Sequence, residues 1–302
     1  MAQRARQLLR QGRGLAVLLL LAAVLGALAG LLDAVFGQGI LSVTAFREAY
    51  PLLMLLLPVA GLLIVFVYAR WGGDCGRGMA LVFDTAAGKR ERPPRRLIPL
   101  AIGATWVTHL FGGSVGREGV AVQISAAAAG LLTPALRTAR SKRLLMITAV
   151  AAGFSGLFRT PLAAVFFALE LFHVGMAEYD ALLPALVASL VATTVSGALG
   201  PKPAAAVPGA EPLPFTVGSL AQLAVLGVAC GLAGWLFVAL LHGLKDRLGR
   251  WLPNAYLRIA LVGLLVAVFG LVTAGRYNGL SEGLSAAALG GGQLYAWDWL
   301  AK

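Results

Sequence analysis

Charged residues are scarce in this chain: only 13% of its 302 residues are Asp, Glu, Lys or Arg, whereas 59% are hydrophobic. A soluble domain carries roughly 25% charged residues, so a deficit of this size excludes an ordinary soluble protein. Most of the surface is therefore expected to face lipid. The composition predicts an all-α integral membrane protein.

Acidic residues are especially few, at 13 against 25 basic residues, which leaves a formal net charge of +12. Such an excess can indicate nucleic-acid binding, but the basic residues here cluster in short segments between apolar runs. Clusters of this kind are typical of cytoplasmic loops under the positive-inside rule. We therefore expect no nucleic-acid partner and a multi-pass protein of the cell (plasma) membrane with a cytoplasmic N-terminus.

Cysteine is nearly absent, since the chain has only Cys75 and Cys230. Neither lies in a metal-ligand spacing, and two cysteines are too few for a disulfide framework. No metal site and no cofactor is predicted. The apolar run from Leu15 to Phe36, which contains Asp33, is longer than the ~7–15 residues of a signal-peptide core, so it predicts a first membrane helix.

Long apolar runs alternate with runs that are too short to span. The long runs cover 51–69, 181–199 and 216–244, and another apolar run covers 260–274. The shorter runs cover 75–87, 97–111, 120–136, 144–158 and 161–172. A perpendicular membrane helix needs ~20 residues, and broken helices form midplane binding sites in transporters. The alternative is that the short runs are tilted helices whose ends extend further.

The segment from Gly112 to Gly119, with the sequence GGSVGREG, places four glycines directly before a helical run. The first N–H groups of a helix lack intrahelical partners, and the helix dipole adds partial positive charge there. A helix start inside a protein is therefore an anion site. Glu118 is expected to cap this helix and to compete with an anion for the same position, so that its protonation links anion flux to pH.

The competing interpretation is an ordinary capping carboxylate that only stabilises the helix. The intramembrane setting favours a functional role, because ionisable groups at membrane depth are costly. For the adjacent Arg117 we expect a structural counter-charge rather than direct ion contact.

The motif Gly116-Arg117-Glu118-Gly119 resembles the G-R-E-G motif of the CLC family of chloride channels and anion/proton antiporters. The stretches 152–158 and 161–170 are similar to the next conserved segments of that family, in the same order and spacing. The resemblance extends over most of the chain. It implies a CLC-like inverted-repeat bundle of tilted and broken helices, a homodimer with one pore per subunit, and Glu118 as the external gating glutamate.

Three departures from the common pattern resemble the fluoride-exporting branch of the family. Val120 replaces the usual proline after G-R-E-G. Met79, after Gly78, stands where an earlier anion loop carries serine, although a methionine on an apolar helix is also ordinary core filler. Glu170 is followed by Leu171 instead of a second glutamate, so Glu170 is either a proton-path residue or a structural carboxylate.

The resemblance implies a first repeat over residues 1–199, a proline-rich loop over 200–215, and the start of a second repeat over 216–302. No helix is expected after the glycines at 290–292, and the second half is expected to be incomplete, as in a C-terminally truncated chain. The predicted gating and proton-accepting residue is Glu118. The predicted anion-binding residues are Gly78, Met79, Gly116, Arg117, Gly119 and Val120.

These residues predict transport of a small halide, as fluoride/proton antiport, with fluoride or chloride, protons and the lipid bilayer as partners, and no enzyme activity. A chloride channel or chloride/proton antiporter is the alternative. Gly153-Phe154-Ser155-Gly156 also matches the G-x-S-G of rhomboid intramembrane proteases, but a serine nucleophile needs a histidine base within hydrogen-bond reach. A scaffold that transports nothing is the third class.

Overall fold

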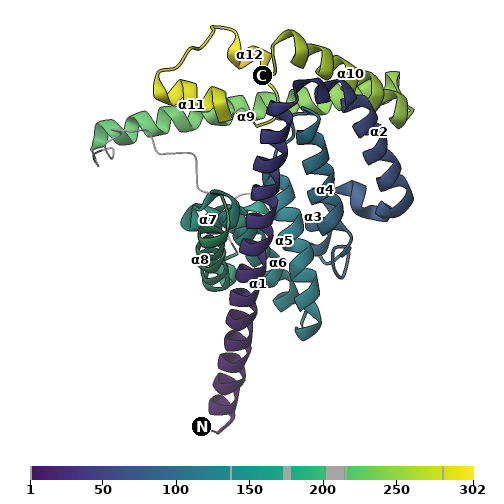
Figure 1. The fold of residues 1–302 in the computed structure, drawn as a ribbon. Coiled ribbons are helices and arrows are strands. Elements are labelled where there is room, and N and C mark those ends of the chain that lie inside the picture. Colours follow the sequence, from purple (N-terminus) through teal and green to yellow (C-terminus); the bar gives the residue numbers. More distant parts are fainter. Residues whose placement is uncertain (1, 137, 173–177, 202–213, 215, 281) are drawn as a thin grey trace.

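The computed structural model describes residues 2–136, 138–172, 178–201, 214, 216–280 and 282–302, and all the regular secondary structure in this part of the chain is helical (Figure 1). The first helices are α1 (Ala2–Ala49), α2 (Leu57–Val67), α3 (Met79–Ala86), α4 (Leu97–Leu110), α5 (Glu118–Leu132), α6 (Ala139–Phe158), α7 (Pro161–Leu171) and α8 (Leu182–Leu199). The later helices are α9 (Val217–Trp251), α10 (Ala255–Val272), α11 (Glu282–Gly290) and α12 (Asp298–Ala301). Short irregular helices are η1 (Pro51–Leu56), η2 (Tyr68–Gly72), η3 (Gly73–Arg77), η4 (Thr133–Ala135) and η5 (Tyr179–Ala181).

Five segments among the described residues are long and apolar enough to cross a membrane. They are 14–49, 51–77, 179–199, 217–251 and 255–272. The all-α membrane fold predicted from composition is therefore confirmed. The first run is longer than predicted, because α1 continues without a break through Asp33 to Ala49.

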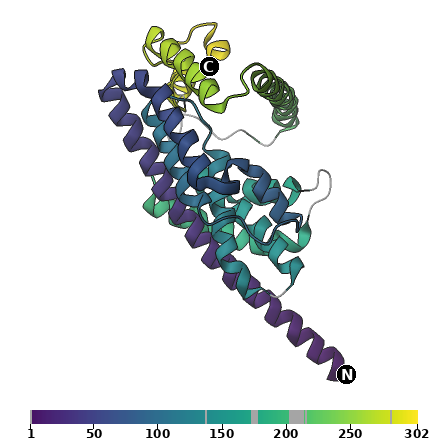
Figure 2. The same cartoon turned by 90° about the vertical axis from the view of Figure 1, so that its right-hand side faces the viewer.

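Helix α1 packs closely on α8, and two glycines make this contact possible. A Cβ atom at Gly26 would lie 2.4 Å from the carbonyl oxygen of Ala188, and one at Gly30 would lie 2.6 Å from that of Ala192. Small residues four positions apart let the backbones of two membrane helices approach closely. In Figure 1, α1 runs through the length of the bundle, and Figure 2 shows it along one edge of the helical layer.

Helix α6 forms the centre of the bundle and packs on α1, α5, α7 and α8. Every residue from Leu144 to Gly153 is buried, and most of them are small or aliphatic. The helix begins at Ala139, earlier than the apolar run 144–158 predicts, because the Thr138 hydroxyl accepts a hydrogen bond from the Ser141 amide and caps it. Its 20 residues correspond to about 30 Å, the thickness of a hydrocarbon core.

The other short runs remain short in the structure. Helices α3, α4, α5 and α7 have 8, 14, 15 and 11 residues. None reaches the ~20 residues of a perpendicular span, so these four helices are as short as the sequence predicts, and their ends at membrane depth stay a prediction. The run predicted over 120–136 ends earlier, where η4 begins at Thr133.

Helix α9 crosses the end of the bundle at which α1 finishes and is exposed along almost its whole length (Figure 1). Thr216 caps its N-terminus, so the helix begins within one residue of the start of the predicted run, but it continues past the predicted end at residue 244 to Trp251. The prediction that no helix follows the glycines at 290–292 is wrong. Helix α12 forms there because the Asp298 carboxylate accepts hydrogen bonds from Arg276, Tyr277 and the Tyr295 amide.

Candidate functional site

The glycine-rich segment joins the end of α4 to the start of α5. The amides of Gly112 and Gly113 donate to the carbonyls of His109 and Thr108 at 3.1 and 2.8 Å, which ends α4. Gly112 has φ +83°, and a Cβ there would lie 2.6 Å from the Asn278 side chain. Only glycine fits this turn. Residues 113–116 then run without regular structure toward α5.

The N-terminus of α5 offers unoccupied backbone donors. Arg117 is the N-cap residue, and its side chain makes no capping hydrogen bond. The first intrahelical bond runs from the Ala121 amide to the Arg117 carbonyl at 3.0 Å. The amides of Glu118, Gly119 and Val120 precede this bond. Partial positive charge is therefore concentrated at this helix start.

Glu118 is the first helical residue rather than the cap, which corrects the predicted position by one residue. Its side chain is exposed. A Cβ at Gly116 would lie 2.6 Å from the Glu118 Oε2 atom, so the carboxylate folds back over the loop and occupies the space that glycine leaves.

A second glycine-bounded helix start lies against the first. Gly78, with φ +55°, is the N-cap of α3, and Met79 is its first residue. A Cβ at Gly119 would lie 3.9 Å from Met79 Cγ. The structure therefore brings together Gly78, Met79 and Gly119, residues predicted from two segments forty positions apart.

Gln123 connects the two helix starts, and the sequence reasoning missed it. A Cβ at Gly78 would lie 3.6 Å from its Oε1, and one at Gly119 would lie 3.6 Å from its Nε2. The sequence did contain a signal for this residue: Gln123 is the one amide side chain on the apolar helix α5, and it lies one turn after Gly119. An amide at this point can orient a ligand with either a donor or an acceptor.

The remaining predicted residues have distinct surroundings. Val120 is buried in the core with Phe36, Ile40 and other apolar side chains, so only its backbone amide faces the helix start. Arg117 is half-buried and has an interaction partner within the chain. Glu170 is exposed on the last turn of α7, which packs on α6 and α8.

Ser155, the serine of the protease-like motif, has a structural role in this arrangement. Its hydroxyl contacts the Ser189 carbonyl at 2.9 Å and the Thr193 hydroxyl at 2.6 Å, which joins α6 to α8. His109 and His242 each bond a carbonyl in their own helix, and His173 lies outside the described residues. Neither described histidine bonds to Ser155. No three His, Cys, Asp or Glu side chains gather as metal ligands in the described part of the chain.

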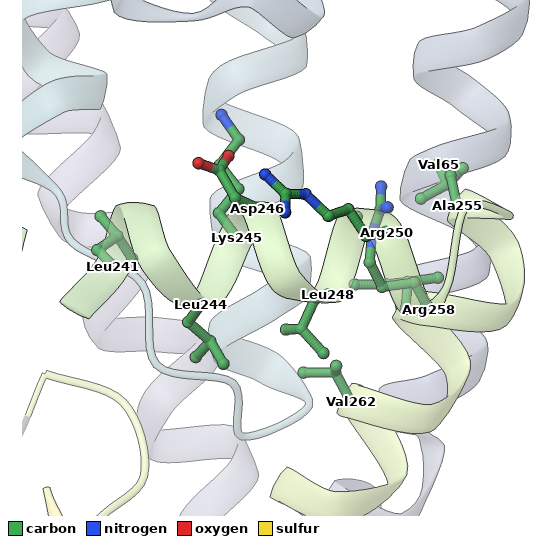
Figure 3. Close-up of a pocket in the computed structure, with 12 residues that line it drawn as sticks. Val65, Leu241, Leu244, Lys245, Asp246, Leu248, Arg250, Ala255, Arg258 and Val262 are labelled. Carbon is green, nitrogen blue, oxygen red and sulfur yellow. The ribbon is translucent and has the colours of Figure 1, made fainter. Parts of the chain in front are cut away.

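A cleft of about 880 Å³ lies away from this site, between α2, α9 and α10 (Figure 3). Its walls are apolar, and its charged residues are Lys245, Asp246, Arg250 and Arg258. Arg258 donates to the Leu252 carbonyl at 3.1 Å. The cleft contains neither of the two glycine-bounded helix starts and is separate from the candidate site.

Comparisons with known proteins match both the sequence and the fold. The chain is 37% identical over 251 residues to a chloride/fluoride channel protein of Pseudomonas syringae pv. tomato, covering 83% of this chain and 55% of the relative. It is 24% identical to an H(+)/Cl(−) exchange transporter of Yersinia pestis, covering 93% of this chain and 62% of that relative. The chain thus spans about 55–62% of the length of these relatives.

Two solved structures share the fold. A CLC-type fluoride/proton antiporter matches with a TM-score of 0.86 and 41% identity, over 95% of this chain and 73% of that one. A slow cyanobacterial Cl⁻/H⁺ antiporter matches with a TM-score of 0.77 and 19% identity, over 94% and 70%. Residues 60–302 match the family described as voltage gated chloride channel. The chain therefore belongs to the voltage gated chloride channel family, the CLC family.

Proposed function

We propose that this protein is a fluoride/proton antiporter in which Glu118 is both the gate and the proton acceptor. The observation that carries the proposal is the position of the Glu118 carboxylate, folded over Gly116 at the uncapped start of α5. The start of α3, with Met79, lies against the same turn. Two helix starts with free amides form an anion site that needs no full cation.

The mechanism follows from competition between two anions for one position. While Glu118 is ionised, its carboxylate occupies the helix start and excludes fluoride. Protonation removes the negative charge, so the side chain loses the attraction of the helix dipole and leaves. Fluoride then takes the place of the carboxylate, and its exit lets Glu118 return and release the proton. One site thereby links movement of the anion to movement of the proton.

Fluoride is favoured over chloride by the residues around the site. Met79 offers a thioether, which has no hydrogen to donate, so it shapes the site by its size and polarizability, and its Cγ lies 3.9 Å from the Cβ position of Gly119. The relatives with the higher identities are named for fluoride, or for chloride and fluoride, whereas those named only for chloride are 19–24% identical. Chloride/proton antiport remains the competing function.

The proposal also includes roles for two other charged residues, the division of the chain into repeats, and the assembly and orientation of the protein. Glu170 is a candidate for the proton path, and Arg117 serves as a structural counter-charge. Residues 1–199 form the first membrane repeat, and residues from 216 onward begin the second. The protein works as a homodimer in the plasma membrane with its N-terminus in the cytoplasm, which the basic residues that precede the apolar run from Leu15 support.

Reconstitution into liposomes tests the proposal. Fluoride and chloride efflux are measured side by side with ion-selective electrodes, with and without an imposed proton gradient. The gradient is expected to drive fluoride, and Glu118→Gln, which mimics the protonated state, is expected to abolish proton coupling whether the anion flux rises or disappears. Glu91→Gln serves as the matched control for losing an exposed carboxylate, because the Glu91 side chain is 77% exposed and has no role in the proposed mechanism.

Three results would contradict the proposal. Wild-type proton-driven fluoride movement in Glu118→Gln would remove Glu118 from the mechanism. A gradient that drives chloride in preference to fluoride would support the chloride antiporter instead. Absence of any anion flux would favour a scaffold that transports nothing.

A further inference from the structure

Asp33 is a buried carboxyl that the proposed mechanism does not use. It lies close to the midpoint of the apolar span 14–49 and is only 3% exposed. Neither of its oxygen atoms has a hydrogen-bond partner among the described residues. Buried polar groups in proteins nearly always have partners, so a carboxyl with none requires a functional explanation.

The position of Asp33 is set by a glycine on the central helix. A Cβ at Gly156 of α6 would lie 2.3 Å from the Asp33 Oδ2 atom. Any other residue at 156 would therefore collide with the carboxyl. One turn earlier on α6, a Cβ at Gly153 would lie 2.6 Å from the Ser125 hydroxyl and equally close to the Ala121 carbonyl.

Gly153 and Gly156 together are called the glycine strip of α6. Two polar groups without hydrogen-bond partners lie on this strip. Cβ positions three residues apart on a helix are about 5–6 Å apart. The Asp33 carboxyl and the Ser125 hydroxyl, which is also buried without a partner, contact adjacent points of the strip. Ser125 is two turns along α5 from Glu118, so the strip connects Asp33 to the gating helix.

The charged groups near α1 leave Asp33 without a counter-charge. Helix α8 has no ionisable residue, and α6 has none between 144 and 158. Arg159, directly after α6, donates to the carbonyls of Ser196 and Pro201 instead of to Asp33.

The other helices that pack on α1 offer no partner to Asp33 either. Helix α5 contributes only Glu118 and α4 only His109. On α1 itself the next ionisable residue is Arg47, whose guanidinium bonds the His109 carbonyl and pairs with Glu48. An ionised carboxylate in these surroundings would be far less stable than the neutral acid.

We infer that Asp33 is a second proton-binding carboxyl of the antiporter, neutral in the structure described here, which exchanges its proton with Glu118 through water that enters beside the glycine strip of α6. In this exchange the Asp33 O–H bond breaks as its proton passes to a water molecule, and water delivers a proton to Glu118, whose O–H bond forms; Asp33 is a carboxylate only until the reverse transfer restores its proton. The inference rests on the proposed function for its transport role, but the proton on Asp33 can be tested separately.

Infrared spectroscopy on the purified chain in lipid bilayers tests the protonation. The wild type is expected to show a protonated-carboxyl C=O band at neutral pH that is lost in Asp33→Asn and kept in Glu118→Gln. Ser189→Ala is the matched control, because its hydroxyl is also buried without a partner, on α8. A band that persists in Asp33→Asn would overturn the inference.

Liposome assays then test the transport role. In Asp33→Asn, the number of protons moved per fluoride is expected to fall at least about fivefold, with recovery in Asp33→Glu and no change in Ser189→Ala. A wild-type ratio in a folded Asp33→Asn protein would overturn the role of Asp33 in antiport. If the wild type moves no protons at all, the proposed function fails and the transport role with it, while the infrared band still decides whether Asp33 holds a proton.

Discussion

Replacing Gly116 with alanine perturbs the resting position of the Glu118 carboxylate and little else. The new Cβ would lie 2.6 Å from Glu118 Oε2, 0.8 Å inside the 3.4 Å at which ordinary van der Waals contact begins. Gly116 does not have positive φ, so its backbone accepts alanine. Because the colliding atom is the flexible end of a side chain, we expect the carboxylate to move off the helix start while the fold stays intact.

The size of the effect follows from the electrostatics of the helix start. A carboxylate at a helix N-terminus is stabilised by about 0.3–2 kcal/mol. Loss of this stabilisation weakens the competitor of fluoride by about 2- to 30-fold, since 1.4 kcal/mol corresponds to a factor of ten. We therefore expect Gly116→Ala to bind fluoride about 2- to 30-fold more tightly than the wild type at neutral pH.

Calorimetric titration of fluoride into the purified protein measures this affinity, and thermal unfolding in the same buffer monitors the fold. Gly14→Ala is the neutral control, because no atom lies within 4 Å of its Cβ position. Gly153→Ala is the opposite control: its Cβ meets the Ala121 backbone at 2.6 Å, so it is expected to destabilise the protein by about 1–3 kcal/mol. An unchanged fluoride affinity in a folded Gly116→Ala protein would refute the competition between Glu118 and the anion.

Two further predictions concern selectivity and the C-terminal tail, defined here as residues 282–302. Met79→Ser introduces a hydroxyl donor beside Gly119, so we expect chloride permeation to rise relative to fluoride in paired efflux assays; an unchanged ratio would make Met79 a packing residue. The Arg276 guanidinium and the Tyr277 hydroxyl lower the pKa of Asp298 well below its ordinary value. The contribution of Asp298 to tail docking is thus complete above its unfolded pKa of about 3.9 and is lost as the pH falls toward the folded value. Indole fluorescence during acid titration should report this release, and Asp298→Asn should show it already at neutral pH; identical titrations of the two proteins would rule out the contact.

Hydropathy and glycine spacing predicted the membrane class, the long helices and the glycine-bounded start of α5. These features are local, because a run of apolar residues in lipid must form a helix to satisfy its own backbone hydrogen bonds, whichever segments pack beside it. The ends of helices were less predictable. The Thr138 cap extends α6 into a basic turn, and the Asp298 contacts create α12, so both boundaries depend on individual side-chain hydrogen bonds.

Gln123 and Asp33 illustrate what the sequence alone left open. Each is a polar residue within an apolar stretch of its helix, and the sequence does not say what its side chain faces. Asp33 follows an apolar run like any residue that ends a helix, yet the structure places it inside α1 against Gly156. Asp33 lacks a hydrogen-bond partner because of the way α1 packs against its neighbouring helices. The local periodicity of the sequence does not encode this packing.

The sequence by itself determined the membrane environment, the family resemblance and the identity of Glu118 as a carboxylate at a glycine-rich helix start, because composition and short motifs encode these features locally. The tertiary structure decided the rest. Only packing brings Met79 next to Gly119, folds the Glu118 carboxylate over Gly116 and encloses Asp33. These contacts join residues tens of positions apart, and their distances depend on how closely glycine lets neighbouring backbones approach.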